Sequence, residues 1–304
     1  MMEFGIWNQN SDLMITDRTS FREIYWLKFI ILVGVVCLVS GCSTPSEKFA
    51  HYAEEQGLLT ETVQTQLFEH QFFVNKLAQL SINRDELHVY LDGDGTPWRN
   101  HYRIADDPTS RNPLILELMQ QDLTPSLMLG RPCYHQLKPL PECLSKYWTS
   151  HRYSTEIVNS MVKALNSWLQ NHDYNKVILI GFSGGGALAV LMAPEVPKVS
   201  KVITIAANLD VAAWSRYHGF EPLDQSLNPA ELDPYSQIEQ IHLVGTDDEM
   251  VPPVTITKFI EKNDTALVIR YPGYEHLCCW ADDWQGVLHK VLHPLLINNS
   301  YLLN

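Results

Sequence analysis

Apolar runs of strand length alternate along this chain with segments whose apolar residues recur at helical spacing. The runs are rich in valine, isoleucine and leucine, and we expect buried strands at 87–91, 126–130, 176–182, 198–206, 239–245 and 266–271, with a looser opening strand at 63–74. Helices are expected at 47–58, 112–121, 155–170 and 282–296. Strands that alternate with helices predict an α/β fold, with a mostly parallel sheet covered by helices on both faces.

One strand leads directly into a glycine-rich turn, Gly181-Phe182-Ser183-Gly184-Gly185, which is followed by a helix-forming run of alanine, leucine and methionine. The pattern G-x-S-x-G between a strand and a helix is typical of a sharp turn that exposes one serine hydroxyl. Small residues suit this turn because the strand and the helix approach each other closely. We therefore take Ser183 as the candidate nucleophile, and the alternative is an ordinary glycine turn.

An acid and a histidine follow in the order that such a serine requires. The pattern G-x-x-D-x-x-V-P begins at Gly245, where a strand ends, and favours Asp248 as the acid. Its neighbours Asp247 and Glu249 remain alternatives. His276 directly follows the last expected strand and precedes the last expected helix, which is the position expected of the base.

These three residue types together make a serine nucleophilic. The imidazole takes the serine proton, and the carboxylate holds the imidazole in the useful tautomer and stabilises the imidazolium. The charge that develops on the substrate oxygen then needs fixed donors. We expect two backbone N–H groups to supply them: that of Gly184, and that of Asp94 in the loop after an early strand, with Gly95 close behind.

The loop Asp92-Gly93-Asp94-Gly95 also has the composition of a calcium-binding turn. An EF-hand loop needs further oxygen ligands and a glutamate at its twelfth position, where this chain has Arg103. We therefore expect neither a metal site nor a cofactor.

The chain resembles the α/β-hydrolase superfamily over most of its length after residue 60. It is also similar to a bacterial branch that carries a Gly-Asp-Gly-x-x-Trp loop (93–98), an Arg-Pro-Cys segment (131–133) and a Tyr-Trp-Thr-Ser-His-Arg stretch (147–152). The resemblance implies the α/β-hydrolase fold and supports the roles of Ser183, Asp248 and His276. It departs at one point: Asp92-Gly93 replaces the familiar His-Gly, so the histidine that often braces the oxyanion loop is absent.

Three ring side chains are candidate substrate contacts. Trp98 ends the loop after the early strand, and Trp214 and His218 lie in an insertion over residues 208–235 that precedes the acid loop. Insertions at this point commonly form a lid or a pocket wall in this fold, and a packed surface crossover is the alternative. Asp210, in the same insertion, is a second candidate for the acid.

Residues 1–41 have the pattern of a bacterial export signal. Basic residues precede an apolar run at 29–39 that is short for a membrane span. The run ends in Leu38-Val39-Ser40-Gly41-Cys42, which resembles a lipobox, so we expect Cys42 to be lipidated and to become the mature N-terminus. The residue after Cys42 is Ser43 and not the aspartate associated with inner-membrane retention. This favours the outer membrane of a Gram-negative cell, with the protein facing the periplasm. A transmembrane anchor is the alternative, and translation starting at Met14 would shorten the long leader.

Four further cysteines remain after Cys42. Cys133 and Cys143 would close a short loop, and an oxidising periplasm permits a disulfide between them. We expect Cys278 and Cys279 to pack as small buried apolar side chains; a disulfide between them, or a bridge elsewhere, is the alternative.

The predicted organisation is a signal peptide over 1–41, a lipidated N-terminus and linker over 42–59, and one α/β-hydrolase domain over 60–304. The formal net charge of −13 disfavours nucleic acid and anionic headgroups as partners. We expect a monomer whose partners are a small-molecule acyl substrate and, through the lipid anchor, a membrane.

These features favour a serine hydrolase that cleaves ester bonds of a small or medium acyl substrate through an acyl-enzyme. The same three residues would serve a peptidase or an acyl-transfer enzyme. A non-catalytic envelope lipoprotein that binds ligands is the third alternative.

Overall fold

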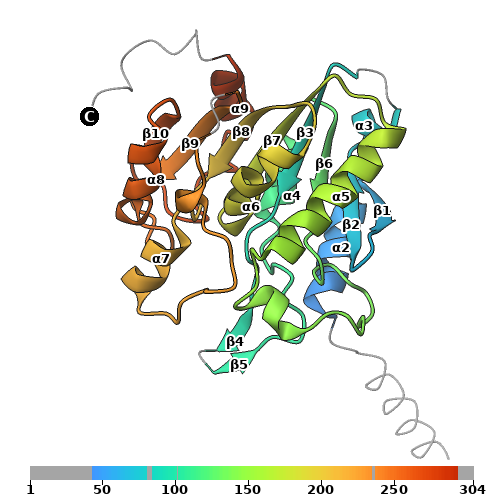
Figure 1. Ribbon diagram of the computed structural model, residues 1–304. Coiled ribbons are helices and arrows are strands. Elements are labelled where there is room, and N and C mark those ends of the chain that lie inside the picture. The colour runs from blue at the N-terminus through green and yellow to red at the C-terminus, as the bar shows by residue number, and fades with distance from the viewer. Residues whose placement is uncertain (1–42, 81–83, 101, 235–236, 294–304) are drawn as a thin grey trace, which may run out of the picture. The chain divides into compact units, whose positions relative to one another are not determined.

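The apolar runs form one eight-stranded sheet within the part of the chain that the computed structural model describes, residues 43–80, 84–100, 102–234 and 237–293 (Figure 1). The strand order is β1-β2-β6-β3-β7-β8-β9-β10. β2 pairs antiparallel with β1 and β6, whereas the pairs from β6 to β10 are parallel. The strands are β1 (Leu59–Gln64), β2 (Glu69–Val74), β3 (Glu86–Leu91), β6 (Ser126–Leu129), β7 (Lys176–Phe182), β8 (Val199–Ile205), β9 (Glu239–Gly245) and β10 (Leu267–Tyr271).

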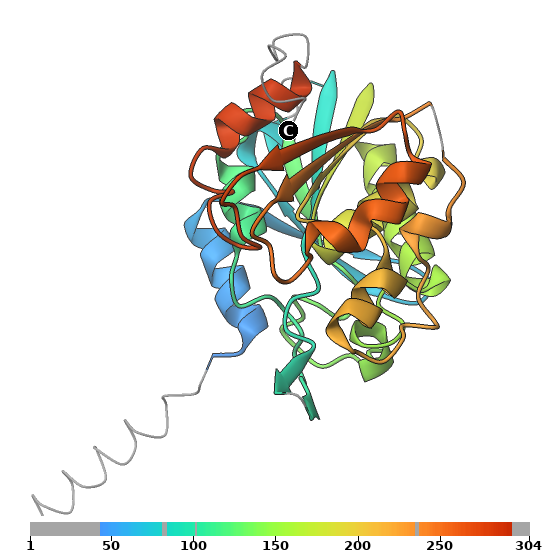
Figure 2. The same ribbon diagram turned by 90° about the vertical axis from the view of Figure 1, so that its left-hand side faces the viewer.

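Helices cover both faces of this sheet (Figure 2). Alternate residues of β7 show why: Val177 and Leu179 belong to one buried cluster, with residues of α5, α6 and α8, while Ile178 and Ile180 belong to another, with residues of α2, α4 and α9. The helices are α2 (Pro45–Glu55), α3 (Lys76–Leu80), α4 (Leu114–Gln120), α5 (Thr155–Asn171), α6 (Gly184–Met192), α7 (Val211–His218), α8 (Thr257–Lys262) and α9 (Trp284–Leu292). The predicted α/β-hydrolase architecture, a mostly parallel sheet between helical layers, is confirmed.

Short elements complete the described chain. A small hairpin, β4 (Trp98–Asn100) and β5 (Arg103–Ile104), follows β3 outside the main sheet. Single 3-10 turns occur at η1 (Ser145–Trp148), η2 (Ala193–Glu195), η3 (Pro229–Glu231) and η4 (Pro253–Ile256). Within the described ranges, no helix combines the length and the apolar character that a membrane span needs.

The opening of the domain differs from the sequence prediction in two respects. The single strand expected at 63–74 is a hairpin of β1 and β2, because Thr65 makes a turn: its N–H and its hydroxyl both donate to the carbonyl of Phe68. The helix expected at 47–58 is present as α2, but it does not lie in a linker, because its Phe49 and Ala53 are buried in the core. These two residues are four apart and share one face of the helix, so this segment belongs to the folded unit.

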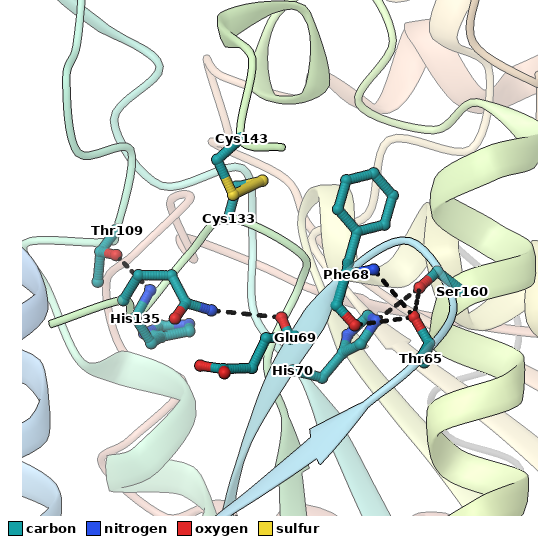
Figure 3. The surroundings of a disulfide bond; sticks show 10 residues. Thr65, Phe68, Glu69, His70, Thr109, Cys133, His135, Cys143 and Ser160 are labelled. Atoms are coloured by element: carbon teal, nitrogen blue, oxygen red, sulfur yellow. Dashed lines mark hydrogen bonds between the residues drawn. A yellow bond between two sulfur atoms is a disulfide. The ribbon is translucent and has the colours of Figure 1, made fainter. Parts of the chain in front are cut away.

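The disulfide favoured by the sequence, Cys133–Cys143, is present (Figure 3). It ties the segment that follows β6 to the loop before η1. Closing a loop of this size typically contributes about 2–4 kcal/mol to the free energy of unfolding. The bond therefore restrains the segment that carries Arg131 and Tyr134.

The expectation for the second cysteine pair was wrong. Cys278 is exposed and Cys279 is partly exposed, and the two form a disulfide with each other. Their loop is anchored by the indole of Trp280, which is fully buried and donates to the carbonyls of Glu275 and His276. The apolar packing expected of the cysteines is thus supplied by the neighbouring tryptophan.

Candidate active site

Ser183 occupies the sharp turn between β7 and α6, as the glycine pattern predicts. Its φ of 52° lies in the region that non-glycine residues rarely adopt, and its N–H is held by the carbonyl of Ile205 at 2.9 Å. A Cβ on Gly181 would clash with the backbone of Gly185, and one on Gly185 would clash with the carbonyl of Leu91. Only glycines let the helix approach the strand ends this closely.

The structure brings Ser183, His276 and Asp248 into one hydrogen-bonded row. His276 Nδ1 lies 2.8 Å from Asp248 Oδ2, and its Nε2 lies 3.0 Å from Ser183 Oγ. With Nδ1–H donating to the carboxylate, Nε2 is left to accept the serine O–H. The other carboxylate oxygen of Asp248 accepts the N–H groups of Met250 and Val251, at 2.8 and 2.7 Å, so this buried carboxylate is fully engaged.

The alternative acids lie elsewhere. Asp247 and Glu249 are exposed, and Asp247 Oδ1 accepts the hydroxyl of Thr246. Asp210 caps helix α7: its Oδ1 accepts the N–H of Ala213 at 3.0 Å and the side-chain amide of Asn228 at 2.9 Å. None of these three carboxylates is the one that meets His276.

Backbone N–H groups at two places lie beside Ser183. Gly184 is the first residue of α6, and the N–H groups of a first helical turn have no partner within the helix. In the loop after β3, a Cβ on Gly93 would lie 3.2 Å from that of Ser183. The N–H of Gly93 is already bound to Asp92 Oδ1 and that of Thr96 to the carbonyl of Pro108, which leaves the N–H groups of Asp94 and Gly95. We take Asp94 as the candidate donor because it directly follows Gly93, the residue that lies beside Ser183.

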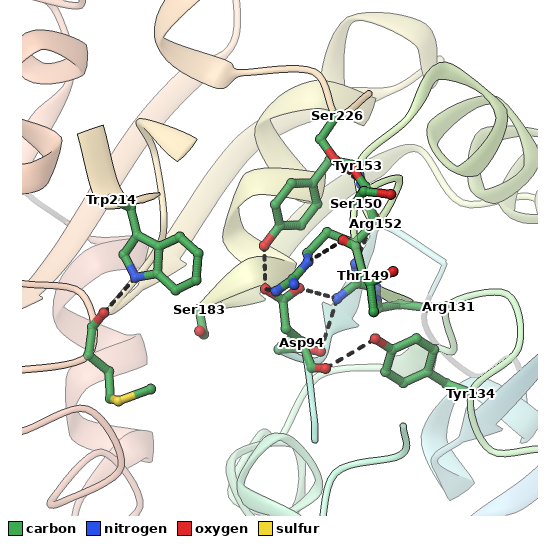
Figure 4. A network of polar contacts seen from close by, with 12 residues as sticks. Asp94, Arg131, Tyr134, Thr149, Ser150, Arg152, Tyr153, Ser183, Trp214 and Ser226 are labelled. Atoms are coloured by element: carbon green, nitrogen blue, oxygen red, sulfur yellow. Dashed lines mark hydrogen bonds and ion pairs between the residues drawn. The ribbon is translucent and has the colours of Figure 1, made fainter. Parts of the chain in front are cut away.

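The side chain of Asp94 is enclosed by residues to which sequence reasoning gave no role (Figure 4). Its Oδ1 accepts Arg131 Nη1 at 2.5 Å, and its Oδ2 accepts Arg152 Nη1 at 3.0 Å and the hydroxyl of Tyr153 at 2.6 Å. Burial alone would raise the pKa of Asp94, but the charges of Arg152 and Arg131 hold it well below its ordinary value. The signal for these residues was the Arg-Pro-Cys and Tyr-Trp-Thr-Ser-His-Arg motifs, in which the arginines stand.

Asp92 has the opposite electrostatic character. Burial raises its pKa to about 7, against the opposing effects of the Gly93 N–H and the charge of Arg131. Within the described structure its buried Oδ2 has no hydrogen-bond partner. A neutral Asp92 avoids placing a second negative charge next to Asp94. The cluster of Asp94, Arg131 and Arg152 then carries a net positive charge.

The aromatic candidates lie at different places. Trp214 and His218 both donate from their ring N–H groups to the carbonyl of Met250, at 2.7 and 3.0 Å, so α7 of the insertion lies against the acid loop. Figure 4 shows Trp214 on the opposite side of Ser183 from Asp94. Trp98 lies on β4 and is 43% exposed. A substrate contact by these rings stays a prediction.

A family model described as "Serine hydrolase (FSH1)" matches residues 139–278, a range that includes the serine, the acid and the histidine. Solved structures of similar fold include a membrane phospholipase A described as a bacterial virulence factor, at 15% identity, 89% of this chain, 99% of that chain and a TM-score of 0.58. An esterase from Pyrococcus furiosus is 12% identical, with 84% of this chain and 95% of that chain covered and a TM-score of 0.58. A proline iminopeptidase-related protein from Thermus thermophilus is 12% identical, with 79% of this chain and 98% of that chain covered and a TM-score of 0.55. No curated protein matches this sequence.

The sheet order and the strand–serine–helix turn give this chain the α/β-hydrolase fold, which it shares with these solved structures. The family match shows that residues 139–278 of this chain are similar to serine hydrolases.

We predict that Asp92 makes stability depend on pH. In the unfolded chain its carboxyl ionises near the ordinary value of 3.8, whereas in the folded protein it stays protonated up to about 7. Between these values the unfolded state binds fewer protons, so the free energy of unfolding of the wild type should fall, relative to Asp92→Asn, by at most a few kcal/mol as pH rises from about 4 to 7. Urea unfolding of both proteins across this range measures the difference, and parallel curves would contradict the assignment.

Proposed function

We propose that this protein cleaves ester bonds of a small or medium acyl substrate, with Ser183 as nucleophile, His276 as general base and acid, and Asp248 as the orienting carboxylate. The observation that carries the proposal is the hydrogen-bonded row in which His276 contacts both partners at 2.8 and 3.0 Å. Because a serine hydroxyl is a weak nucleophile by itself, this contact with an oriented imidazole is what the chemistry requires.

The proposed reaction proceeds in two halves. Ser183 Oγ attacks the acyl carbon while its proton passes to Nε2 of His276, and the N–H groups of Gly184 and Asp94 receive the developing oxyanion. His276 then returns the proton to the leaving alcohol oxygen, which leaves the acyl group as an ester on Ser183. In the second half, His276 takes a proton from water as the water oxygen attacks the acyl carbon. The bond between the acyl carbon and Ser183 Oγ then breaks, His276 returns the proton to Oγ, and the carboxylic acid is released.

An ester is the favoured substrate because two of the structural neighbours are named for ester hydrolysis, a phospholipase A and an esterase. The neighbour related to proline iminopeptidase supports amide cleavage as the second candidate. The same serine and histidine serve both reactions, so the distinction lies with the pocket that holds the substrate.

We also propose that the protein is attached to the cell envelope by acyl chains on Cys42. The folded unit begins close to that residue: Thr44 caps α2, and the N–H of Ser46 donates to Asp107 Oδ2 at 2.8 Å. Only Ser43 separates the lipobox cysteine from the capping residue, and one extended residue spans at most about 3.6 Å. Lipid on Cys42 would therefore hold the domain next to the bilayer surface.

A fluorophosphonate probe tests the proposed nucleophile. We expect the folded wild type to be labelled on Ser183 and Ser183→Ala to be unlabelled, with kcat for an ester substrate reduced by about 10⁶-fold. Labelling of folded Ser183→Ala, or an inert wild type, would contradict the proposal. A matched panel of esters, amides and thioesters with one acyl group then ranks the leaving groups.

The proposed acid has a matched control in its exposed neighbour. Asp248→Asn should lower kcat by about 10⁴-fold, since the carboxylate that fixes the imidazole tautomer is lost. Asp247→Asn should leave kcat close to the wild type, because its side chain does not reach His276. Equal losses in both variants would show that Asp248 is wrongly assigned.

Radiolabelled palmitate tests the anchor in intact bacterial cells. We expect the wild type and Cys37→Ala to incorporate label and to partition into the detergent phase, while Cys42→Ala does neither. The partitioning depends on the acyl chains, since each buried CH₂ group contributes about 0.8 kcal/mol. Cys37 is the control, since it lies within the expected signal. Incorporation of label by Cys42→Ala would exclude Cys42 as the acylated residue.

A further inference from the structure

Asp94 is held from both of its adjoining peptide groups. In addition to the three donors on its carboxylate, the hydroxyl of Tyr134 donates to its main-chain carbonyl at 3.0 Å. Arg131 alone among these donors also reaches the preceding peptide, since its Nη1 lies 3.2 Å from the carbonyl oxygen of Gly93. Its Nη2 donates to the carbonyl of Arg152 at 2.8 Å, which fixes the guanidinium plane.

The bond to Gly93 determines the direction of the N–H of Asp94. The carbonyl of Gly93 and the N–H of Asp94 belong to one planar trans peptide, in which they point in opposite directions. An arginine that holds the carbonyl therefore directs the N–H away from itself. Figure 4 shows Arg131 and Ser183 on opposite sides of Asp94, so the N–H is directed to the Ser183 side.

We propose that Arg131 is a positioning residue for the oxyanion site: it orients and polarises the Gly93–Asp94 peptide, whose N–H is one of the two donors to the reacting oxygen. This inference rests on the proposed function of Ser183. It gives a physical replacement for the histidine brace that the Asp92-Gly93 sequence lacks.

Charge and burial make this bond strong. Arg131 is 1% exposed, and a charged donor on a carbonyl in a low-dielectric interior pulls electron density from the amide and strengthens its N–H as a donor. The effect grows as negative charge develops on the acyl oxygen, and it is small for the neutral ground-state carbonyl. Loss of Arg131 should therefore lower kcat and leave KM nearly unchanged.

Arg152 provides the matched control. Like Arg131 it is buried and donates to the carboxylate of Asp94, but its Nε donates to the carbonyl of Thr149 and not to that of Gly93. Arg131→Gln and Arg152→Gln each remove one buried charge from Asp94, and only the first removes the donor on the oxyanion peptide.

The experiment compares these variants with the wild type, using steady-state kinetics on one ester, inhibition by an alkyl boronic acid and thermal unfolding. We expect both variants to unfold at lower temperature. Arg131→Gln should lose about 10- to 100-fold in kcat, with KM within about twofold and with a matching loss of affinity for the boronic acid, whose tetrahedral adduct resembles the transition state. Arg152→Gln should lose much less of both.

Equal losses of kcat in the two variants, or a wild-type kcat in folded Arg131→Gln, would overturn the proposal. If Arg131→Gln does not fold, Arg131→Lys decides the matter, because an ammonium keeps the charge but cannot span Gly93, Asp94 and Arg152 together. A folded Arg131→Lys with kcat lowered at least about tenfold supports the proposal, and a wild-type kcat overturns it. Failure of the proposed function itself is distinguishable, since the wild type would then not react with a fluorophosphonate.

Discussion

Helix α6 packs so closely against the ends of β3 and β7 that only glycine fits at the contacts made by Gly181 and Gly185. This contact forces Ser183 into a positive φ and brings the Gly93–Asp94 loop to its side. The acid loop and the histidine loop follow β9 and β10, which end at the same edge of the parallel sheet. The positions of Ser183, Asp248 and His276 therefore follow from the sheet order and from one close helix–strand contact.

A buried charge cluster lies on one side of this contact. Two arginines surround one ionised aspartate, while burial keeps the neighbouring Asp92 protonated up to a pH of about 7. Removing one partner from such a cluster leaves a buried unpaired charge, which typically costs several kcal/mol. The Cys133–Cys143 disulfide ties down the segment that carries Arg131. The same buried contacts therefore stabilise the Gly93–Asp94 loop and hold its peptide group in place.

Local patterns allowed much of this structure to be predicted. Contiguous runs of residues predicted the serine turn and the strands β3, β7, β8, β9 and β10. The order of residues along the chain then indicated Asp248 and His276. What could not be predicted depends on contacts between distant segments. Arg131 and Arg152 meet Asp94 across 37 and 58 residues. The spacing of apolar residues predicted helix α2, but not the packing of its Phe49 and Ala53 in the core. Trp280 occupies the buried position expected of the neighbouring cysteines, and Cys278 and Cys279 form a disulfide with each other.

The most direct measurement of this geometry is a crystal structure of the protein after reaction with a phosphonate ester. The hydrolytic mechanism predicts phosphorus bonded to Ser183 Oγ, with the phosphoryl oxygen about 2.7–3.1 Å from the N–H groups of both Gly184 and Asp94 and His276 still bound to Asp248. A phosphoryl oxygen directed into solvent, or an adduct on another residue, would contradict it.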